Sequence, residues 1–138
     1  MTKLTSRPLD RQSEGTQLFT FAVRRWVKAA VDGQCVCHVI GAAFRTAGLQ
    51  EASVPFHAAM QTLCQNARKP LRFGTPERSL LSIQEAQLVH ALGAAASDRQ
   101  DIVRRIAEGL VFPDLAPSLS ASLDRVSRAF IRSGFSFE

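Results

Sequence analysis

Residues 82–96 have the sequence SIQEAQLVHALGAAA, and this stretch decides the fold that we predict. It begins with Ser82 and places Glu85 three residues later, which is the spacing of a capping box at the start of an α-helix. The helix that follows, up to about Ala96, is apolar on nearly every side. A helix with so little polar surface is expected in the middle of a bundle.

Helical spacing also dominates the rest of the chain, where apolar residues recur every three to four positions and strand alternation is nearly absent. Glycine and proline residues end or begin most of these segments. The five further predicted helices are residues 16–31, residues 34–47, a segment from Ser53, a segment capped by residues 97–98, and a segment from Pro117 to Gly134. The sequence therefore predicts an all-α, single-domain bundle of about six short helices.

Two parts of the chain are predicted to be irregular. Residues 69–79 hold two prolines, one glycine and two arginines, a composition that predicts a non-helical arm between the third and fourth helices. Residues 1–12 are polar, and we expect them to form a flexible tail, with residues 13–138 as the helical domain.

The composition is that of a globular protein, with 46% hydrophobic and 21% charged residues and a net charge of +5. No apolar run reaches the ~18–20 residues of a membrane span, so we expect no membrane partner. Three cysteines and a polar N-terminal segment favour a reducing compartment, and we predict a cytoplasmic location.

Catalytic motifs are missing from the sequence. The nucleophile elbow, the phosphate-binding loop and the dinucleotide-binding glycine pattern do not occur. The capping box explains Glu85, and we expect His90 to be a buried, hydrogen-bonded side chain. We therefore predict a non-enzymatic protein without catalytic residues or a cofactor.

One cluster of metal-type side chains lies in the run Cys35-Val36-Cys37-His38 and in the next predicted helix. The candidate ligands are Cys35, His38, His57 and Cys64. His57 and Cys64 lie about 10 Å apart along a helix, whereas donor atoms lie about 2.0–2.3 Å from a shared zinc ion. We therefore predict no metal site and expect Cys37 and Cys64 to be small buried residues.

A redox role for these cysteines is a related hypothesis. If Asp32 caps the second helix, Cys35 lies in its first turn, where the helix dipole favours a thiolate. Only Cys37 is placed to act as a resolving partner, and we expect an unreactive thiol. A helical sensor that responds to a metal or a small molecule through these Cys and His residues is our alternative hypothesis.

Basic side chains mark a predicted interaction surface. Phe21 lies outside the apolar stripe of its helix, among cations, and the arm adds more cations and a second phenylalanine. The predicted surface comprises Phe21, Arg24, Arg25, Lys28, Arg68, Lys69, Arg72 and Phe73. We predict that it binds a protein partner or a second copy of the chain, as a homodimer.

Weak nucleic-acid binding is a second alternative for the same basic chain. The second and third predicted helices, joined at Gly48, have the order of a helix-turn-helix. However, the third begins Ser53-Val54-Pro55-Phe56, so its N-terminus lacks the Arg, Lys, Asn or Gln side chains that reach base edges.

Three runs of the sequence carry a resemblance. They are Phe21-Ala22-Val23-Arg24-Arg25-Trp26, Arg68-Lys69-Pro70-Leu71-Arg72 and Ser82-Ile83-Gln84-Glu85-Ala86-Gln87-Leu88. Over about residues 18–134 the chain resembles small helical proteins of proteobacteria with no assigned function, some with extra cysteines where this chain has residues 75–78. The resemblance implies an α-helical fold in a bacterial protein, and no activity or metal site.

Overall fold

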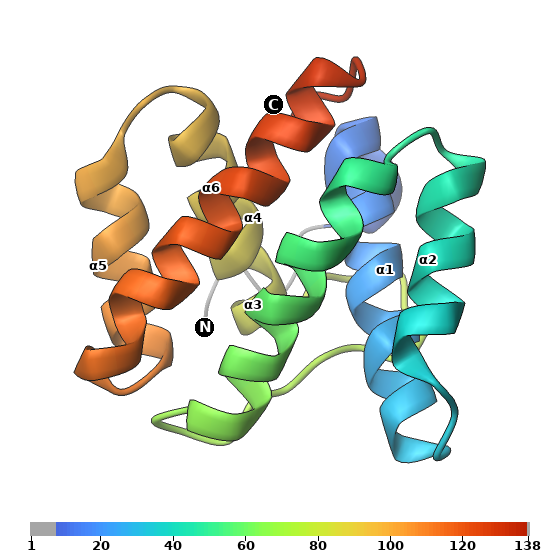
Figure 1. The fold of residues 1–138 in the computed structure, drawn as a ribbon, viewed down its shortest axis with the longest axis horizontal. Helices are drawn as coiled ribbons and strands as arrows, with labels where there is room; N and C mark the ends of the chain where they lie inside the picture. The colour runs from blue at the N-terminus through green and yellow to red at the C-terminus, as the bar shows by residue number, and fades with distance from the viewer. Residues whose placement is uncertain (1–7, 138) are drawn as a thin grey trace.

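The computed structural model describes residues 8–137 and confirms the all-α class: six α-helices and no strand occur in this part of the chain (Figure 1). The helices are α1 (Glu14–Val31), α2 (Val36–Thr46), α3 (Ser53–Asn66), α4 (Ile83–Ala96), α5 (Gln100–Leu110) and α6 (Ala116–Arg132). Short 3₁₀ turns cover Leu9–Arg11, Gln50–Ala52 and Pro113–Leu115. None of the helices described is both long and apolar enough to cross a bilayer.

The core is organised around α6, which packs against α3, α4 and α5, while α1 packs against α2 (Figure 1). Phe130 of α6 lies in edge-to-face contact with Phe19 and Phe44, at centroid distances of 6.4 and 6.1 Å. Phe135 and Phe137 fold back onto the same ring after Gly134 ends the helix, as expected from the sequence. Each aromatic pair adds about 0.5–1.5 kcal/mol beyond its burial.

α4 begins with the predicted capping box. The Glu85 N–H donates to the Ser82 hydroxyl at 3.2 Å, and the Ser82 N–H donates to the Glu85 carboxylate at 2.9 Å. Leu88 and Leu92 are fully buried, but the prediction that His90 is buried is wrong, because this side chain is exposed. α4 packs against α1, α5 and α6 and leaves the His90 side open to solvent.

The predicted cap of the fifth helix is wrong, and the Asp32 cap on which the redox hypothesis depends is not formed. The N-cap of α2 is Cys35 rather than Asp32, which instead follows α1 and pairs with Lys28 at 3.1 Å. The N-cap of α5 is Arg99, because Asp98 adopts a left-handed φ of 59° and belongs to the preceding turn. In both places several residues beside a turn could serve as the cap, and the backbone geometry decides which of them does.

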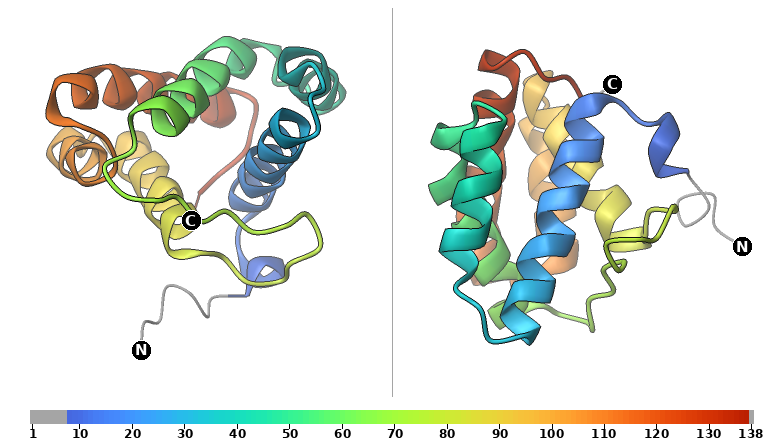
Figure 2. Two further views of the ribbon diagram at one scale, coloured as in Figure 1. Left: turned by 90° about the horizontal axis from the view of Figure 1, so that it is seen from below. Right: turned by 90° about the vertical axis from the view of Figure 1, so that its right-hand side faces the viewer.

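The irregular arm between α3 and α4 is confirmed. Figure 2 shows it leaving the end of α3, passing beside α1 and returning to the start of α4. The Arg68 N–H donates to the Leu110 carbonyl at 3.0 Å and fastens the start of the arm to the end of α5.

The predicted tail lies partly outside the described residues, which begin at Pro8. Within it, Leu9–Arg11 form a 3₁₀ turn, and the Leu9 N–H donates to the Ser79 carbonyl at 2.7 Å. Contacts with the helical domain therefore begin before residue 13.

Candidate functional site

A buried ion pair joins α1 to α4. The Arg24 Nε and Nη2 atoms each donate to one Glu85 carboxylate oxygen at 2.9 Å, and both side chains are 1% exposed. This two-bond geometry matches the flat guanidinium to the flat carboxylate. Each buried charge therefore has an opposite charge in direct contact.

The same pair holds the arm. Arg24 also donates to the Arg78 carbonyl at 2.5 Å and to the Leu80 carbonyl at 2.8 Å, while the Gly74 N–H donates to Glu85 at 2.8 Å. Burial alone would raise the pKa of the Glu85 carboxyl, but the hydrogen bonds from Arg24, Ser82 and Gly74 outweigh it and lower that pKa. The arm is therefore fastened to both helices through one charged centre.

Gly74 is required by this arrangement. A Cβ atom added to it would lie 2.8–2.9 Å from the Arg24 guanidinium, closer than real side chains approach. The glycine lets the arm backbone come near enough to donate to Glu85.

The prediction that Arg24 belongs to an exposed surface is wrong. The arm covers it, and Glu85 with two carbonyl groups supplies the partners that make burial of a charge tolerable. The capping role predicted for Glu85 is confirmed, but its second role was missed. The sequence alone carried no signal for this role: Thr16, Thr20 and Arg24 recur every four residues on one face of α1, which by itself predicts a solvated stripe, and only the structure shows all three to be buried.

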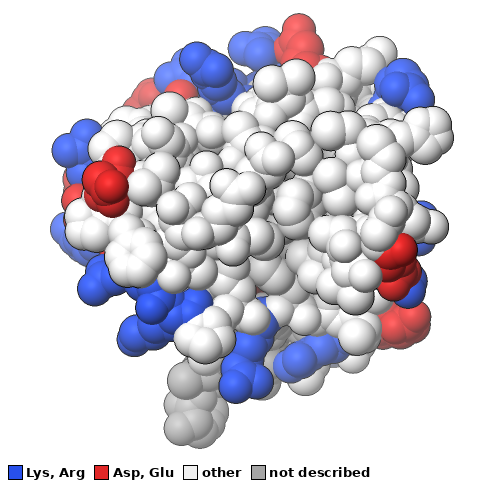
Figure 3. Space-filling view, turned by 60° about the horizontal axis from the view of Figure 1, so that its bottom comes forward, with Lys and Arg blue, Asp and Glu red and all other residues white. Residues whose placement is uncertain are grey.

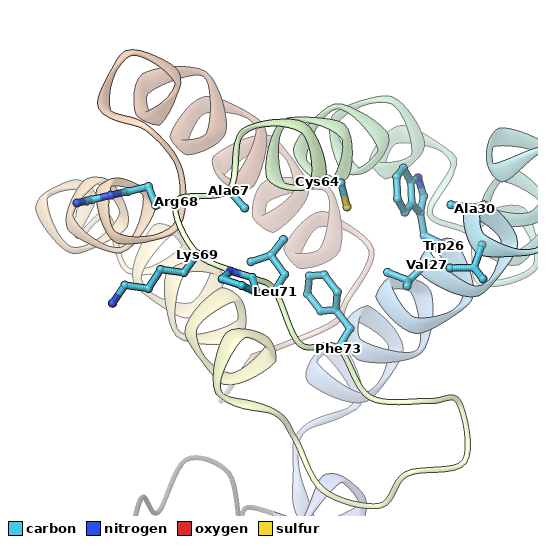
Figure 4. Close-up of a pocket in the computed structure, with 11 residues that line it drawn as sticks. Trp26, Val27, Ala30, Cys64, Ala67, Arg68, Lys69, Leu71 and Phe73 are labelled. Carbon is cyan, nitrogen blue, oxygen red and sulfur yellow. The ribbon is translucent and has the colours of Figure 1, made fainter.

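An open groove lies between α1, the end of α3 and the first part of the arm (Figure 4). Its volume is about 600 Å³, within the ~300–1,000 Å³ of ligand sites. Its apolar wall includes Trp26, Val27, Ala30, Leu71 and Phe73. Arg68 and Lys69 line one end, and none of its lining residues is acidic.

A smaller groove of about 280 Å³ is also lined by Phe73. It shares Val27 and Val31 with the first groove, but both acidic and basic residues line it, among them Lys28 and Glu77. Of these two grooves, only the larger one is lined by basic residues without acidic ones.

The other residues of the predicted surface fall into separate places. Phe21 is 44% exposed, and the Arg25 guanidinium lies 5.6 Å from its ring centroid, as a cation–π pair that lines neither groove. Arg72 is exposed, and its backbone N–H donates to Gln84 at 3.3 Å. The arm does pack beside α1. Arg68, Lys69 and Phe73 of the arm line the larger groove, and Lys28 of α1 lines the smaller one.

The candidate metal ligands are not brought together. No group of three or more Cys, His, Asp or Glu side chains suited to an ion occurs among residues 8–137. Cys35 and His38 are exposed near the start of α2, whereas Cys64 lies on the groove wall. The expectation that Cys37 and Cys64 are buried is wrong, since both are exposed. Partial burial nevertheless raises the pKa of the Cys64 thiol.

His57 is held between two other side chains. The Trp26 indole N–H donates to His57 Nδ1 at 3.1 Å, and Cys37 Sγ lies 3.7 Å from Nε2. An indole can only donate, so Nδ1 is unprotonated and a neutral His57 carries its proton on Nε2, facing the thiol. A zinc ion or a general base for Cys37 would need the lone pair at that nitrogen. The arrangement suits neither role.

Comparisons of the chain with family models, with curated proteins and with solved structures found no match. The resemblance to helical proteins of proteobacteria therefore stays a prediction.

Proposed function

We propose that this protein is a non-enzymatic helical interaction module that binds a protein partner, or a second copy of itself, through the basic surface formed by α1 and the arm. The larger groove is the centre of that surface. The observation that carries the proposal is an open apolar groove with two cations at one end and no acidic lining residue.

The composition of the groove is that of a binding surface rather than of an ordinary solvated face. Aromatic residues and arginine are enriched at protein interfaces, and the groove contains Trp26, Phe73 and Arg68. Val31, at its mouth, is 79% exposed, an apolar side chain that gains from being covered. Contact with a partner would remove this surface from water.

The groove also has fixed walls. The Arg24–Glu85 pair fastens the arm to α1 and α4, so the arm is ordered before any partner arrives. A partner that binds here would not pay the entropy of ordering the arm, which favours affinity.

The proposal is tested by blocking the groove. Ala30 is exposed in the α1 wall, so Ala30→Phe fills the groove without disturbing the core. The matched control is Ala42→Phe, at an exposed position of α2 that does not line the groove. Self-association is measured by sedimentation equilibrium, and a partner isolated on the wild-type chain is purified and titrated against each variant.

We expect Ala30→Phe to weaken the interaction at least about tenfold, or about 1.4 kcal/mol, and Ala42→Phe to leave it unchanged. Equal affinity of the two variants would refute the groove as the binding site. The double variant Phe21→Ala/Arg25→Glu tests whether the binding surface extends to their cation–π pair. If the partner covers this pair, we expect the double variant to abolish the complex.

Location and nucleic-acid binding belong to the same proposal. We propose that the protein acts in the cytoplasm, where its three free cysteines would stay reduced. An RNA-binding form of the interaction predicts affinity that falls steeply with salt. We expect instead no salt-dependent binding of RNA in a titration.

A further inference from the structure

We infer that the groove binds an acidic–apolar segment of a partner protein. Its carboxylates would lie beside Arg68 and Lys69, and its apolar side chains would lie against Trp26, Leu71 and Phe73. This inference rests on the proposed function. It adds the chemistry of the bound segment and the end of the groove at which its acidic part lies.

The charges of the groove are separated along its length. Figure 4 shows Arg68 and Lys69 at one end, extending away from the apolar wall, with Trp26 and Ala30 at the other end. Figure 3 shows one face with an uncharged centre and several Lys and Arg side chains along its lower edge, while the other edges carry both basic and acidic side chains. A segment that binds here must therefore be apolar in one part and accept positive charge at one end.

The two cations are available to a partner. None of the ion pairs found among the described residues includes Arg68 or Lys69. Arg68 donates to the backbone carbonyl of Glu108 at 2.6 Å, a neutral acceptor, so no ion pair among the described residues balances its charge. The carboxylates of an acidic segment would balance this positive charge, whereas a basic segment would be repelled by it.

The open shape of the groove favours a segment of a protein over a small lipid-like anion. Ala30, Val31 and Pro70 on its rim are all exposed, so the groove covers only one side of a bound molecule. Sites for small molecules enclose about 70–90% of the ligand surface. A protein segment does not need such enclosure, because the rest of its own protein covers the outer side.

Trp26 supplies a reporter for the test, because it is the single tryptophan and lines the groove. The probes are a panel of short synthetic peptides that join apolar residues to two glutamates, the same peptides with lysine for glutamate, and dodecanoate as the lipid-like anion. Each is titrated while Trp26 emission is recorded. We expect saturable binding of acidic peptides, at least about tenfold tighter than that of their basic counterparts.

Charge reversal at Lys69 makes the test reciprocal. Lys69 is exposed and takes part in none of the ion pairs found among the described residues, so Lys69→Glu should fold and should reduce or reverse the preference for acidic peptides. Arg125→Glu, an equal charge change at an exposed position of α6 outside the groove, should leave the preference intact. The Ala30→Phe variant should lose all peptide binding.

Three results would overturn the inference: equal binding of acidic and basic peptides, an unchanged preference in Lys69→Glu, or binding of dodecanoate without binding of any peptide. Each leaves the proposed function standing if Ala30→Phe still weakens the complex with the purified partner. If Ala30→Phe has no effect on that complex, the proposed function itself fails.

Discussion

Replacing Glu85 with glutamine removes the charge that balances Arg24 while keeping the size of the side chain. The Glu85 carboxylate accepts four hydrogen bonds, two from Arg24 and one each from Gly74 and Ser82. An amide has one oxygen that accepts and one nitrogen that donates, so some of these N–H donors would face the donating amide nitrogen. Arg24, whose side chain is 1% exposed, would remain a buried cation without a counter-charge.

Removal of one partner from a buried ion pair costs about 3–5 kcal/mol. We expect Glu85→Gln to destabilise the protein by that amount, a large share of the ~5–15 kcal/mol of an ordinary domain. Arg24→Met should cost a similar amount, because it leaves the Glu85 carboxylate buried without its cation. The double variant should cost clearly less than the sum of the two, since it leaves neither charge unpaired.

Urea unfolding of the wild type, both single variants and the double variant measures these free energies. We expect a coupling energy of at least about 2 kcal/mol between Arg24 and Glu85. Single-variant costs that add to within about 0.5 kcal/mol would refute the account of this pair as the fastening of the arm.

Three further predictions concern the pH dependence of stability, the two glycines Gly74 and Gly109, and the metal content of the protein. Because the folded-state pKa of Glu85 is lowered, its contribution to stability is present above the ordinary Glu pKa of about 4.3 and is lost as pH falls through the lower folded-state value. Urea unfolding at a series of pH values should therefore show wild type and Glu85→Gln converging in acid, and a constant difference would contradict this. Gly74→Ala should destabilise the protein by about 1–3 kcal/mol through its clash with Arg24. In the control variant Gly109→Ala the added Cβ meets nothing within 4 Å, so we expect this variant to be as stable as the wild type or more stable. Thermal unfolding measures both variants, and equal changes in stability at the two glycines would be inconsistent with the geometry. Elemental analysis of protein purified without chelator should find Zn, Fe, Cu and Ni far below one ion per chain, and a stoichiometric ion would restore the sensor hypothesis.

Local features of the sequence determined most of the secondary structure. The three- to four-residue apolar spacing predicted six helices and the all-α class, and the Ser82–Glu85 spacing predicted the start of α4. Gly33, Gly48 and Gly134 follow helix ends with φ values of 74°, 75° and 91°. These signals act between residues close in the chain, so they can be recognised without knowing what packs against them.

Burial and the site were decided by contacts between distant parts of the chain. Arg24 and Glu85 are 61 residues apart, and only the path of the arm turns an apparently exposed arginine into a buried one. The same limit explains why His90 and Cys37 were expected inside and lie outside: helical spacing shows which residues share a face, but not which face a neighbour covers. The groove exists because the arm is fastened beside α1, so its apolar wall and its cations meet only in the folded chain.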